Sequence, residues 1–371
     1  MRPSDYSTTQ RLAVVALGIF ASLTTAGVIF GFQALRPALI ADGVFGWLCG
    51  ENDLQLLRLN LMFAIASTGA NVASLPIGIF LDRYGPRATV LTGSILFALG
   101  GLLFGLSSQK FDMFIPGYLL LGIGGPFCFI GSLHLSLTFP SRSGLIMAAL
   151  TGAFDASSSI YFLFEGIHQH VQQPIQHFFL FYCAIPATIF ILTTLLMPSS
   201  PFDNPTLAEE VTSSSDTLDE RSSLLPPTNN DNNDDDERRK GNAQSSGRLL
   251  KRQLGGVEFW GITTTICIYM LRLNFYISSI EEQISDLDAA AHNPSEVQTI
   301  VNFFNIGLPL GGIVSIPFIG YLLDNYRLST SFAVLWVTGV GYGVLGLIPV
   351  VPLQYATVTV FAVMRPLLYT L

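Results

Sequence analysis

Long apolar runs separated by short polar turns make up most of this chain. A helix that crosses a bilayer needs about 20 mostly apolar residues, and ten stretches reach or nearly reach that length. They are residues 12–34, 59–81, 89–107, 112–137, 144–165, 177–197, 257–277, 298–323, 329–349 and 354–371. In lipid only helices and closed barrels satisfy their own backbone, and these runs are too long for barrel strands. The pattern therefore predicts an all-α polytopic membrane protein.

One polar segment interrupts the apolar pattern. Residues 199–256 are rich in Ser, Pro, Asn and Asp, with a nearly continuous acidic run at 231–237. Such a stretch cannot bury enough apolar surface to offset the conformational entropy that folding would cost. We therefore predict a disordered cytosolic loop over 199–256, between a six-helix bundle at 1–198 and a second bundle at 257–371.

Composition agrees with a membrane protein and excludes several functions. Half of the residues are hydrophobic and 12% are charged, whereas soluble domains carry about 25% charged residues. Many of the acidic residues behind the net charge of −8 lie in residues 199–256, so the net charge argues neither for nor against a nucleic-acid partner, and none is predicted. The sequence contains no nucleotide-binding glycine loop, zinc-protease pair or nucleophile elbow, so we predict neither an enzyme nor a cofactor.

Cysteine and histidine spacing predicts no disulfide framework and no metal site. The four cysteines are far apart, at Cys49, Cys128, Cys183 and Cys267. Three histidines, His168, His170 and His177, share one predicted outer loop, where a loose polar cluster is the ordinary interpretation.

Basic residues divide unevenly between the two sides of the predicted bundle. With the N-terminus in the cytosol, the cytosolic turns carry Arg83, Arg87, Arg142 and Arg327, together with the basic residues of 238–252. The opposite side carries only Arg36, Arg58 and Lys110. Because cytosolic loops are enriched in Lys and Arg, the N-terminus is predicted to be cytosolic.

Two segments about 240 residues apart are nearly the same. Gly78–Tyr84 reads Gly-Ile-Phe-Leu-Asp-Arg-Tyr, and Gly320–Tyr326 reads Gly-Tyr-Leu-Leu-Asp-Asn-Tyr, with four identities at a constant offset of 242 residues. Each segment ends one apolar run and precedes another. A repeat of this length in a membrane protein indicates two homologous halves with a cavity between them.

The first of these segments extends to a longer signature. Residues 78–87 (Gly-Ile-Phe-Leu-Asp-Arg-Tyr-Gly-Pro-Arg) resemble the Gly-x-Leu-x-Asp-Arg-x-Gly-Arg-Arg loop of the major facilitator superfamily. The sequences of this segment and of residues 272–277 and 365–370 are similar to those of the system-L type large neutral amino acid facilitators of this superfamily. The resemblance implies two pseudo-symmetric helix bundles and facilitated transport of neutral amino acids by alternating access.

The chain departs from this family pattern in two ways. The second bundle has four predicted helices rather than six, so we expect a truncated chain that lacks the eleventh and twelfth helices. The fifth helix also lacks a Gly-Pro antiporter signature, since Gly125-Pro126 lies in the fourth helix, and this weakens an exchange mechanism.

The resemblance also implies a conformational latch. In the superfamily, the Asp matching Asp82 is thought to hold the N-terminus of the eleventh helix when the cytosolic side is closed. A carboxylate near a helix N-terminus gains about 0.3–1 kcal/mol. The latch residues would be Gly78, Asp82, Arg83, Gly85, Arg87 and Asp324. Asp324 would act on the start of the fifth helix near Ser143; alternatively, Asp82 and Arg83 only anchor a topology turn.

Two arginines in predicted helices are candidates for substrate binding. A charge in mid-helix costs about 2.5–3.5 kcal/mol, so Arg272 and Arg365 should face a cavity and find an anion. The carboxylate of an amino acid suits a guanidinium, which binds it in a bidentate way. The alternatives are an internal ion pair with Asp155 or Glu165, or snorkelling to the membrane interface.

Other polar residues in predicted helices have two interpretations each. Asp155 is either a proton-coupling group or, as we favour, a structural partner of Arg272. Further candidates to bind a substrate ammonium or carboxylate are Thr24, Thr25, Gln33 and Asn274. Thr and Ser in membrane helices more often bond to their own backbone or to a neighbouring helix.

The sequence as a whole indicates a carrier of a small organic solute, most simply neutral amino acids. A proton-coupled carrier that uses Asp155 and a non-transporting nutrient sensor or scaffold are the alternatives. Within the central loop, Glu220 precedes Leu224 and Leu225 in the arrangement of an acidic dileucine sorting signal. This signal predicts a sorting adaptor as partner and favours the vacuolar or lysosomal membrane over the plasma membrane.

Overall fold

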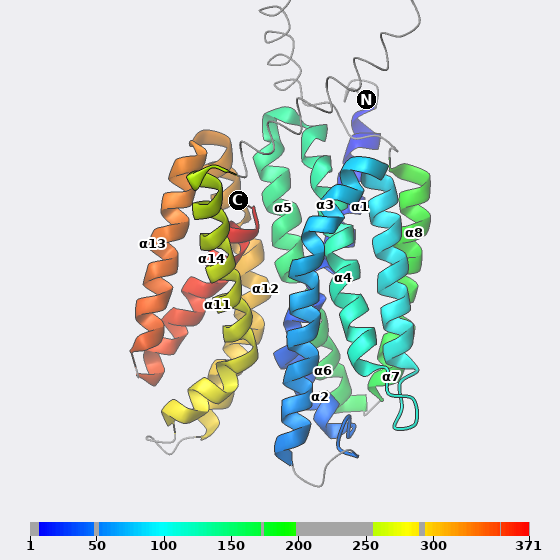
Figure 1. Cartoon of the computed structure of the whole chain (residues 1–371), viewed down its shortest axis with the longest axis vertical. Helices are drawn as coiled ribbons and strands as arrows, with labels where there is room; N and C mark the ends of the chain where they lie inside the picture. The colour runs from blue at the N-terminus through cyan, green and yellow to red at the C-terminus, as the bar shows by residue number, and fades with distance from the viewer. Residues whose placement is uncertain are drawn as a thin grey trace, which may run out of the picture. The chain divides into compact units, whose positions relative to one another are not determined.

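The computed structural model describes residues 7–47, 52–171, 174–197, 255–288, 294–348 and 350–370. These segments are almost entirely helical, as Figure 1 shows, which confirms the predicted all-α class. The chain divides into two compact units, Met1–Asp203 with Leu273–Leu371, and Asn204–Arg272. Most of the central loop lies outside the described residues, so its disorder and the division into two bundles stay predictions.

The first half of the chain supplies the first six predicted spans. The elements are α1 (Thr8–Ala21), η2 (Ser22–Ala26), η3 (Val28–Gly31), α2 (Phe32–Ala41), α3 (Asn52–Gly105), α4 (Phe114–Leu133), η4 (His134–Thr138), η5 (Pro140–Arg142), α5 (Ser143–Ala156), α6 (Ser159–Val171), α7 (Ile175–Tyr182) and α8 (Ala184–Leu196). The chain enters α1 through a capping box, in which Ser7 Oγ accepts from the N–H of Gln10 and Gln10 Oε1 accepts from that of Ser7.

The second half of the chain supplies the helices at the remaining four predicted windows. They are α11 (Val257–Asp288), α12 (Pro294–Asn325), α13 (Leu328–Leu347) and α14 (Gln354–Thr370), with the short η6 (Val351–Leu353) before the last. Within the described residues, eight helices are long and apolar enough to cross a membrane. α3 counts once among them but holds two predicted windows, and α11, which contains Arg272 and Asn274, is not among them.

A single glycine separates the two windows within α3. Gly85 has φ 83° and ψ 171°, a backbone conformation that costs a residue with a Cβ far more than it costs glycine. Pro86 follows and suits the start of the next helix, since its missing N–H has no partner to lose there. The repeated signature around Asp82 is therefore a turn between two spans, as the sequence predicts.

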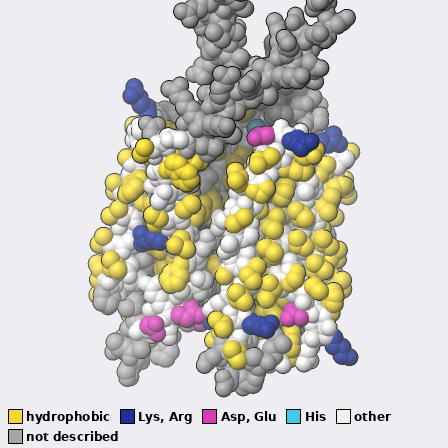
Figure 2. All heavy atoms as spheres, viewed as in Figure 1, with side chains coloured by type: hydrophobic (Ala, Val, Ile, Leu, Met, Phe, Trp, Pro, Cys, Tyr) yellow, Lys and Arg dark blue, Asp and Glu magenta, His cyan; other side chains and the backbone are white. Residues whose placement is uncertain are grey.

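Apolar side chains dominate the outer surface. On the face drawn in Figure 2, they cover most of the described surface, and charged side chains gather mainly toward its upper and lower ends. The exposed side chains include Val72 at 69%, Leu75 at 75% and Phe181 at 81%. Water-soluble proteins rarely expose contiguous apolar surface of this extent, so this surface faces lipid.

Glycines allow the closest helix contacts. A Cβ added at Gly124 of α4 would lie 2.7 Å from the backbone nitrogen of Phe97, and one at Gly117 would lie 2.8 Å from that of Phe104. Both contacts join α4 to α3, and Gly125 meets the broken first span in the same way. These glycines therefore let α4 pack closely against α3 and the first span.

A second glycine contact joins the two halves of the repeat. α5 and α12 lie side by side in Figure 1. A Cβ at Gly152 of α5 would lie 2.8 Å from the carbonyl oxygen of Gly312, and one at Gly320 would lie 3.1 Å from the Cα of Leu145. The backbones of these two helices thus approach each other at two levels, and we call this contact the α5–α12 seam.

Candidate functional site

A buried ion pair connects the two halves at the level of the seam. Arg365 of α14 is 0% exposed and Asp155 of α5 is 1% exposed, and Arg365 Nη1 lies 3.0 Å from Asp155 Oδ1. The sequence favoured Arg272 as the partner of Asp155, and here the partner is Arg365. A charge in mid-membrane is costly unless it is paired, so each group needs the other.

Three aromatic rings surround the guanidinium of Arg365. Its Cζ lies 4.6 Å from the ring centroid of Phe30, 5.5 Å from that of Tyr369 and 5.7 Å from that of Phe154. Ring faces attract a cation and exclude water, which strengthens the charge interaction inside the ring cluster. Sequence reasoning missed these rings, although Tyr369 lies one helical turn after Arg365 and Phe154 directly precedes Asp155.

The ion pair leaves most of its hydrogen-bonding capacity unused. Among the described residues, neither carboxylate oxygen of Asp155 makes a hydrogen bond. The three guanidinium nitrogens of Arg365 (Nε, Nη1 and Nη2) make none either. Their 3.0 Å approach therefore lacks hydrogen-bond geometry and acts through charge alone. A buried polar group without a hydrogen bond costs about 1–3 kcal/mol, so this ion pair is the candidate site at which a ligand would supply the missing bonds.

The first span is broken where it passes this pair. A π-helical turn (η2) and a 3₁₀ turn (η3) flank Gly27, and η3 carries Phe30 to the guanidinium. Neighbouring helices bond to the backbone here: Ser157 Oγ accepts from the N–H of Gly27 at 2.8 Å, and Tyr118 Oη donates to the carbonyl of Ile29 at 2.9 Å. Irregular backbone at membrane depth is tolerated where protein groups satisfy it in this way.

The threonines of this broken segment do not point free hydroxyl protons at the site. Thr24 Oγ1 donates to the carbonyl of Phe20 at 2.7 Å, and Thr25 Oγ1 donates to that of Ala21 at 2.8 Å. The backbone alternative that the sequence allowed is the one found here. Tyr182 Oη also donates to the carbonyl of Thr24.

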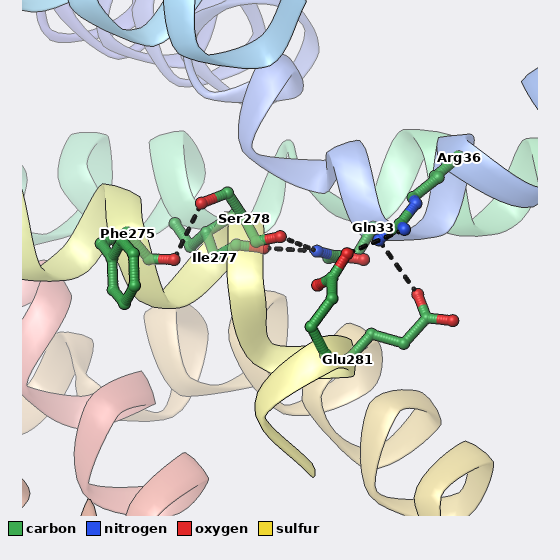
Figure 3. A network of polar contacts seen from close by, with 7 residues as sticks. Gln33, Arg36, Phe275, Ile277, Ser278 and Glu281 are labelled. Carbon is green, nitrogen blue, oxygen red and sulfur yellow. Dashed lines mark hydrogen bonds and ion pairs between the residues drawn. The ribbon is translucent and has the colours of Figure 1, made fainter. Parts of the chain in front are cut away.

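One end of the molecule carries a second contact between the halves, drawn in Figure 3. Gln33 of α2 donates through Nε2 to the carbonyls of Ile277 at 2.7 Å and Ser278 at 3.0 Å in α11. The sequence offered Gln33 as a substrate ligand, and its amide nitrogen is used here for helix contact. Its Oε1 is buried, with no hydrogen-bond partner in the described structure.

Arg36 adds charge to this contact one helical turn further along α2. Its side chain is only 6% exposed and lies 2.8 Å from Glu282 Oε1 and 3.3 Å from Glu281 Oε2. The two glutamates are 44% and 43% exposed, so the network lies at a water-accessible boundary. We call Gln33, Arg36, Glu281, Glu282 and the two carbonyls the Arg36 tie. Sequence reasoning treated Arg36 as a loop charge and overlooked its partners.

The opposite end carries a third contact between the halves. Asp324 Oδ1 at the end of α12 accepts a hydrogen bond of 2.9 Å from the N–H of Gly144 at the start of α5. The sequence placed Asp324 at this helix start, next to Ser143. We call this contact the Asp324 tie. Its carboxylate bonds to one of the unpaired amides of a helix N-terminus, where the helix dipole favours negative charge.

The remaining residues of the first signature lie around the Gly85 turn. Asp82 is exposed, and Arg83 lies over the ring of Tyr84, 5.5 Å from its centroid. Arg87 donates to the carbonyl of Thr194 in α8 at 2.6 Å, which joins helices of the first half to each other. A Cβ at Gly78 would meet open space, so that glycine needs no close contact.

The structure does not connect the other candidate residues to this arrangement, and some of them are beyond the described residues. Arg272 belongs to the second compact unit and its side chain is exposed, whereas Asn274 of α11 is half-buried. The proposed sorting residues, Glu220, Leu224 and Leu225, lie outside the described residues. In the part of the chain that is described, no three His, Cys, Asp or Glu side chains are grouped so that they could hold a metal ion.

Comparison with known proteins decides the class. The family model of the Major Facilitator Superfamily matches residues 12–371. The chain belongs to the major facilitator superfamily. It is a multi-pass membrane transporter of this superfamily, whose members are in general not enzymes.

Several characterised or named proteins are similar in sequence. Protein FMP42 of Saccharomyces cerevisiae is 32% identical, in an alignment that covers 98% of this chain and 81% of that protein. The equilibrative nucleobase transporter 1 of Bos taurus is 23% identical over 97% of this chain and 81% of its own length. The large neutral amino acids transporter small subunit 3 of Mus musculus is 29% identical over 53% of this chain and 38% of its own length.

Solved structures show the same fold at low identity. The proton:xylose symporter XylE aligns with a TM-score of 0.64 at 13% identity, covering 98% of this chain and 82% of its own. The human organic anion transporter MFSD10 aligns with a TM-score of 0.56 at 16% identity, covering 98% and 86%. These likenesses establish the major facilitator fold.

Proposed function

We propose that this major facilitator protein transports neutral amino acids by alternating access. The observation that carries the proposal is the buried pair of Asp155 and Arg365, one from each half, with donors and acceptors that make no hydrogen bond among the described residues. A carboxylate suits the guanidinium, because the two groups form paired, charge-assisted hydrogen bonds. The names of several relatives, which include amino acid and nucleobase transporters, agree with a small polar solute.

The three contacts between the halves supply the moving parts. Opening toward one side requires the Arg36 tie to break, and opening toward the other requires the Asp324 tie to break. Asp155 belongs to α5, whose start carries the Asp324 tie, and Phe30, which lies on the guanidinium of Arg365, precedes Gln33 of the Arg36 tie by three residues. Alternating access follows when the two ties do not open together.

The residues around Asp82 would act on the same side as the Asp324 tie. Asp82 and Asp324 occupy equivalent positions of the repeat, so Asp82 would bind the start of a helix of the second half as Asp324 binds that of α5. Gly85 provides the turn that presents it, Arg83 lies over the ring of Tyr84 within the turn, and Arg87 joins the turn to α8. We propose this latch at the cytosolic side, with the N-terminus in the cytosol.

In this proposal Arg272 and Asn274 are lesser candidates for substrate contact than Asp155 and Arg365. Thr24 and Thr25 stabilise the backbone of the broken span. The proposed location is the vacuolar or lysosomal membrane, because the central loop contains the acidic dileucine segment. A sorting adaptor would be the partner that reads it.

A transport panel with purified full-length protein in proteoliposomes tests the function. Labelled leucine, arginine, adenine and xylose are offered one at a time, without a pH gradient. The proposal expects saturable leucine uptake that unlabelled leucine suppresses. Saturable uptake of adenine or xylose without uptake of any amino acid would contradict it.

A further inference from the structure

We propose that Asp155 binds the ammonium group of the substrate, so that a zwitterion enters the site by replacing the ion pair of Asp155 and Arg365. This inference rests on the proposed function, because it assigns the second charged group of the same site. It makes Asp155 the residue that selects substrates by charge, rather than a proton relay or a purely structural partner.

Charge balance is the first argument. The pair carries one negative and one positive charge in a place where both side chains are at most 1% exposed. An isolated buried charge is strongly unfavourable, so anything that separates the pair must return a charge to each partner. A zwitterion does this, because its carboxylate faces Arg365 and its ammonium faces Asp155. A solute with only a carboxylate pairs with Arg365 and leaves the charge of Asp155 unpaired, and a solute with only an ammonium does the reverse.

Hydrogen-bond capacity is the second argument. Both oxygens of Asp155 and three nitrogens of Arg365 make no hydrogen bond within the described structure. An ammonium offers three donors, and a carboxylate offers two acceptor oxygens in the geometry of the guanidinium edge. The α-amino acid group thus supplies hydrogen-bond donors to the oxygens of Asp155 and hydrogen-bond acceptors to the nitrogens of Arg365.

The surroundings hold both charged groups in place. The Cβ of Asp155 packs so closely on α12 that a Cβ built on Gly312 would lie 2.5 Å from it, which restricts movement of the carboxylate. Phe30, Phe154 and Tyr369 fix the guanidinium and present ring faces that also attract an ammonium. Because α5 and α14 belong to different halves, movement of one half against the other changes the distance between Asp155 and Arg365, so the substrate can replace their contact as the pair separates.

A series of competitors that share the isobutyl side chain of leucine tests charge selection in the native protein. Leucine carries both charges, 4-methyl-2-oxopentanoate carries only the carboxylate and 3-methylbutylamine carries only the ammonium. Each is scored by the concentration that halves uptake of labelled leucine into proteoliposomes. We expect leucine to compete at least about tenfold better than either single-charge analogue, the effect of one charged hydrogen bond. Equal competition by either analogue would overturn the proposal.

The variant Asp155→Asn then assigns the ammonium contact to this residue. The labelled probe is 4-methyl-2-oxopentanoate, which needs no ammonium partner. We expect the advantage of leucine over the oxo acid to fall by about tenfold or more, since a neutral amide replaces the charged partner, whereas Asp155→Glu retains it. A structural role would weaken all competitors alike, so an unchanged leucine advantage in Asp155→Asn overturns the assignment.

The two proposals fail in different ways. If the native protein shows no saturable leucine uptake, the proposed function is wrong and the inference falls with it. If leucine is transported but the analogues compete equally, only the charge selection by Asp155 is wrong. Should Asp155→Asn be poorly folded, the competitor series on the native protein still decides.

Discussion

Asp324 and Gly144 lie 180 residues apart, yet the carboxylate of one accepts a 2.9 Å hydrogen bond from the backbone N–H of the other. Asp324 ends α12 and Gly144 opens α5, so the bond joins the two halves at one end of the α5–α12 seam. A Cβ at Gly144 would overlap the carboxylate, which explains why the smallest residue follows Ser143. A single hydrogen bond of this kind suits the latch that we propose, because it can be broken at a small cost in free energy.

Substitution of Asp324 should loosen this end in a graded way. Asp324→Ala removes the acceptor, and loss of a helix-capping group costs about 0.5–2 kcal/mol. Asp324→Asn keeps an acceptor oxygen and loses only the charge, so its effect should be smaller. Thermal unfolding and the transport rate of both variants would report the order native, Asn, Ala. Equal behaviour of Ala and native protein would show that the tie contributes nothing.

Bulk added to the α5–α12 seam should be poorly tolerated. In Gly152→Ala the new Cβ would lie 2.6 Å from Ile316 and 2.8 Å from the carbonyl oxygen of Gly312. Overpacking of this kind costs about 1–3 kcal/mol, so the melting temperature should fall. Gly166→Ala is the matched control, because a Cβ there meets open space on the helix α6. The account requires the first variant to be clearly less stable than the second.

The Arg36 tie should show energetic coupling between its two sides. We expect a double-mutant cycle of Arg36→Gln and Glu282→Gln to give about 0.5–1 kcal/mol, because the glutamate is half-exposed although the arginine is buried. The cycle with Glu281→Gln should give less, since its contact is 3.3 Å rather than 2.8 Å. Additive effects in both cycles, measured by thermal unfolding, would argue against the tie.

The ion pair should allow the empty carrier to change orientation. When the substrate leaves, Asp155 and Arg365 pair again, so both net uptake and exchange should proceed without a proton gradient. In Asp155→Asn the empty state strands the charge of Arg365, which costs about 3–5 kcal/mol for a buried pair. Net uptake of 4-methyl-2-oxopentanoate should then slow at least about tenfold relative to its exchange. Equal slowing of both fluxes would count against this role.

The sorting segment predicts an address that fluorescence microscopy can read. With Leu224→Ala and Leu225→Ala together, the tagged carrier should move from an internal membrane to the cell surface, because adaptors need both leucines. A matched variant, Leu249→Ala with Leu250→Ala, changes a second leucine pair in the central segment without the acidic residue at Glu220. An unchanged distribution of the first variant at equal expression would contradict the proposed sorting signal.

Much of the fold could be predicted from apolar periodicity and the repeat. All windows except 257–277 overlap helices that are long and apolar enough to cross a membrane, because lipid requires such helices. The repeat also indicates that Asp324 lies near the start of the fifth helix, where it bonds to the N–H of Gly144. α11 ran past its predicted end at residue 277 to Asp288, because a helix can extend beyond the apolar run into water. That extension carries Glu281 and Glu282, which is why the Arg36 tie was missed.

The site itself could be predicted only in part. Apolar surroundings marked Arg365 and Asp155 as intramembrane charges, but their pairing depends on helix rotation and packing that periodicity does not encode. The apolar pattern also does not predict the break of the first span at Gly27. Its partners, Ser157 and Tyr118, are distant in sequence, and no local pattern links them to it.

Leucine counterflow in proteoliposomes, compared between native protein, Arg365→Lys and Lys110→Ala, tests the central claim most directly. Arg365→Lys keeps the charge that pairs with Asp155 but loses the bidentate guanidinium, and Lys110 is an exposed residue far from the ion pair in sequence. The account predicts saturable counterflow in the native protein and in Lys110→Ala, with at least about tenfold weaker leucine affinity in Arg365→Lys. Native affinity in Arg365→Lys, or native protein without counterflow, would contradict it.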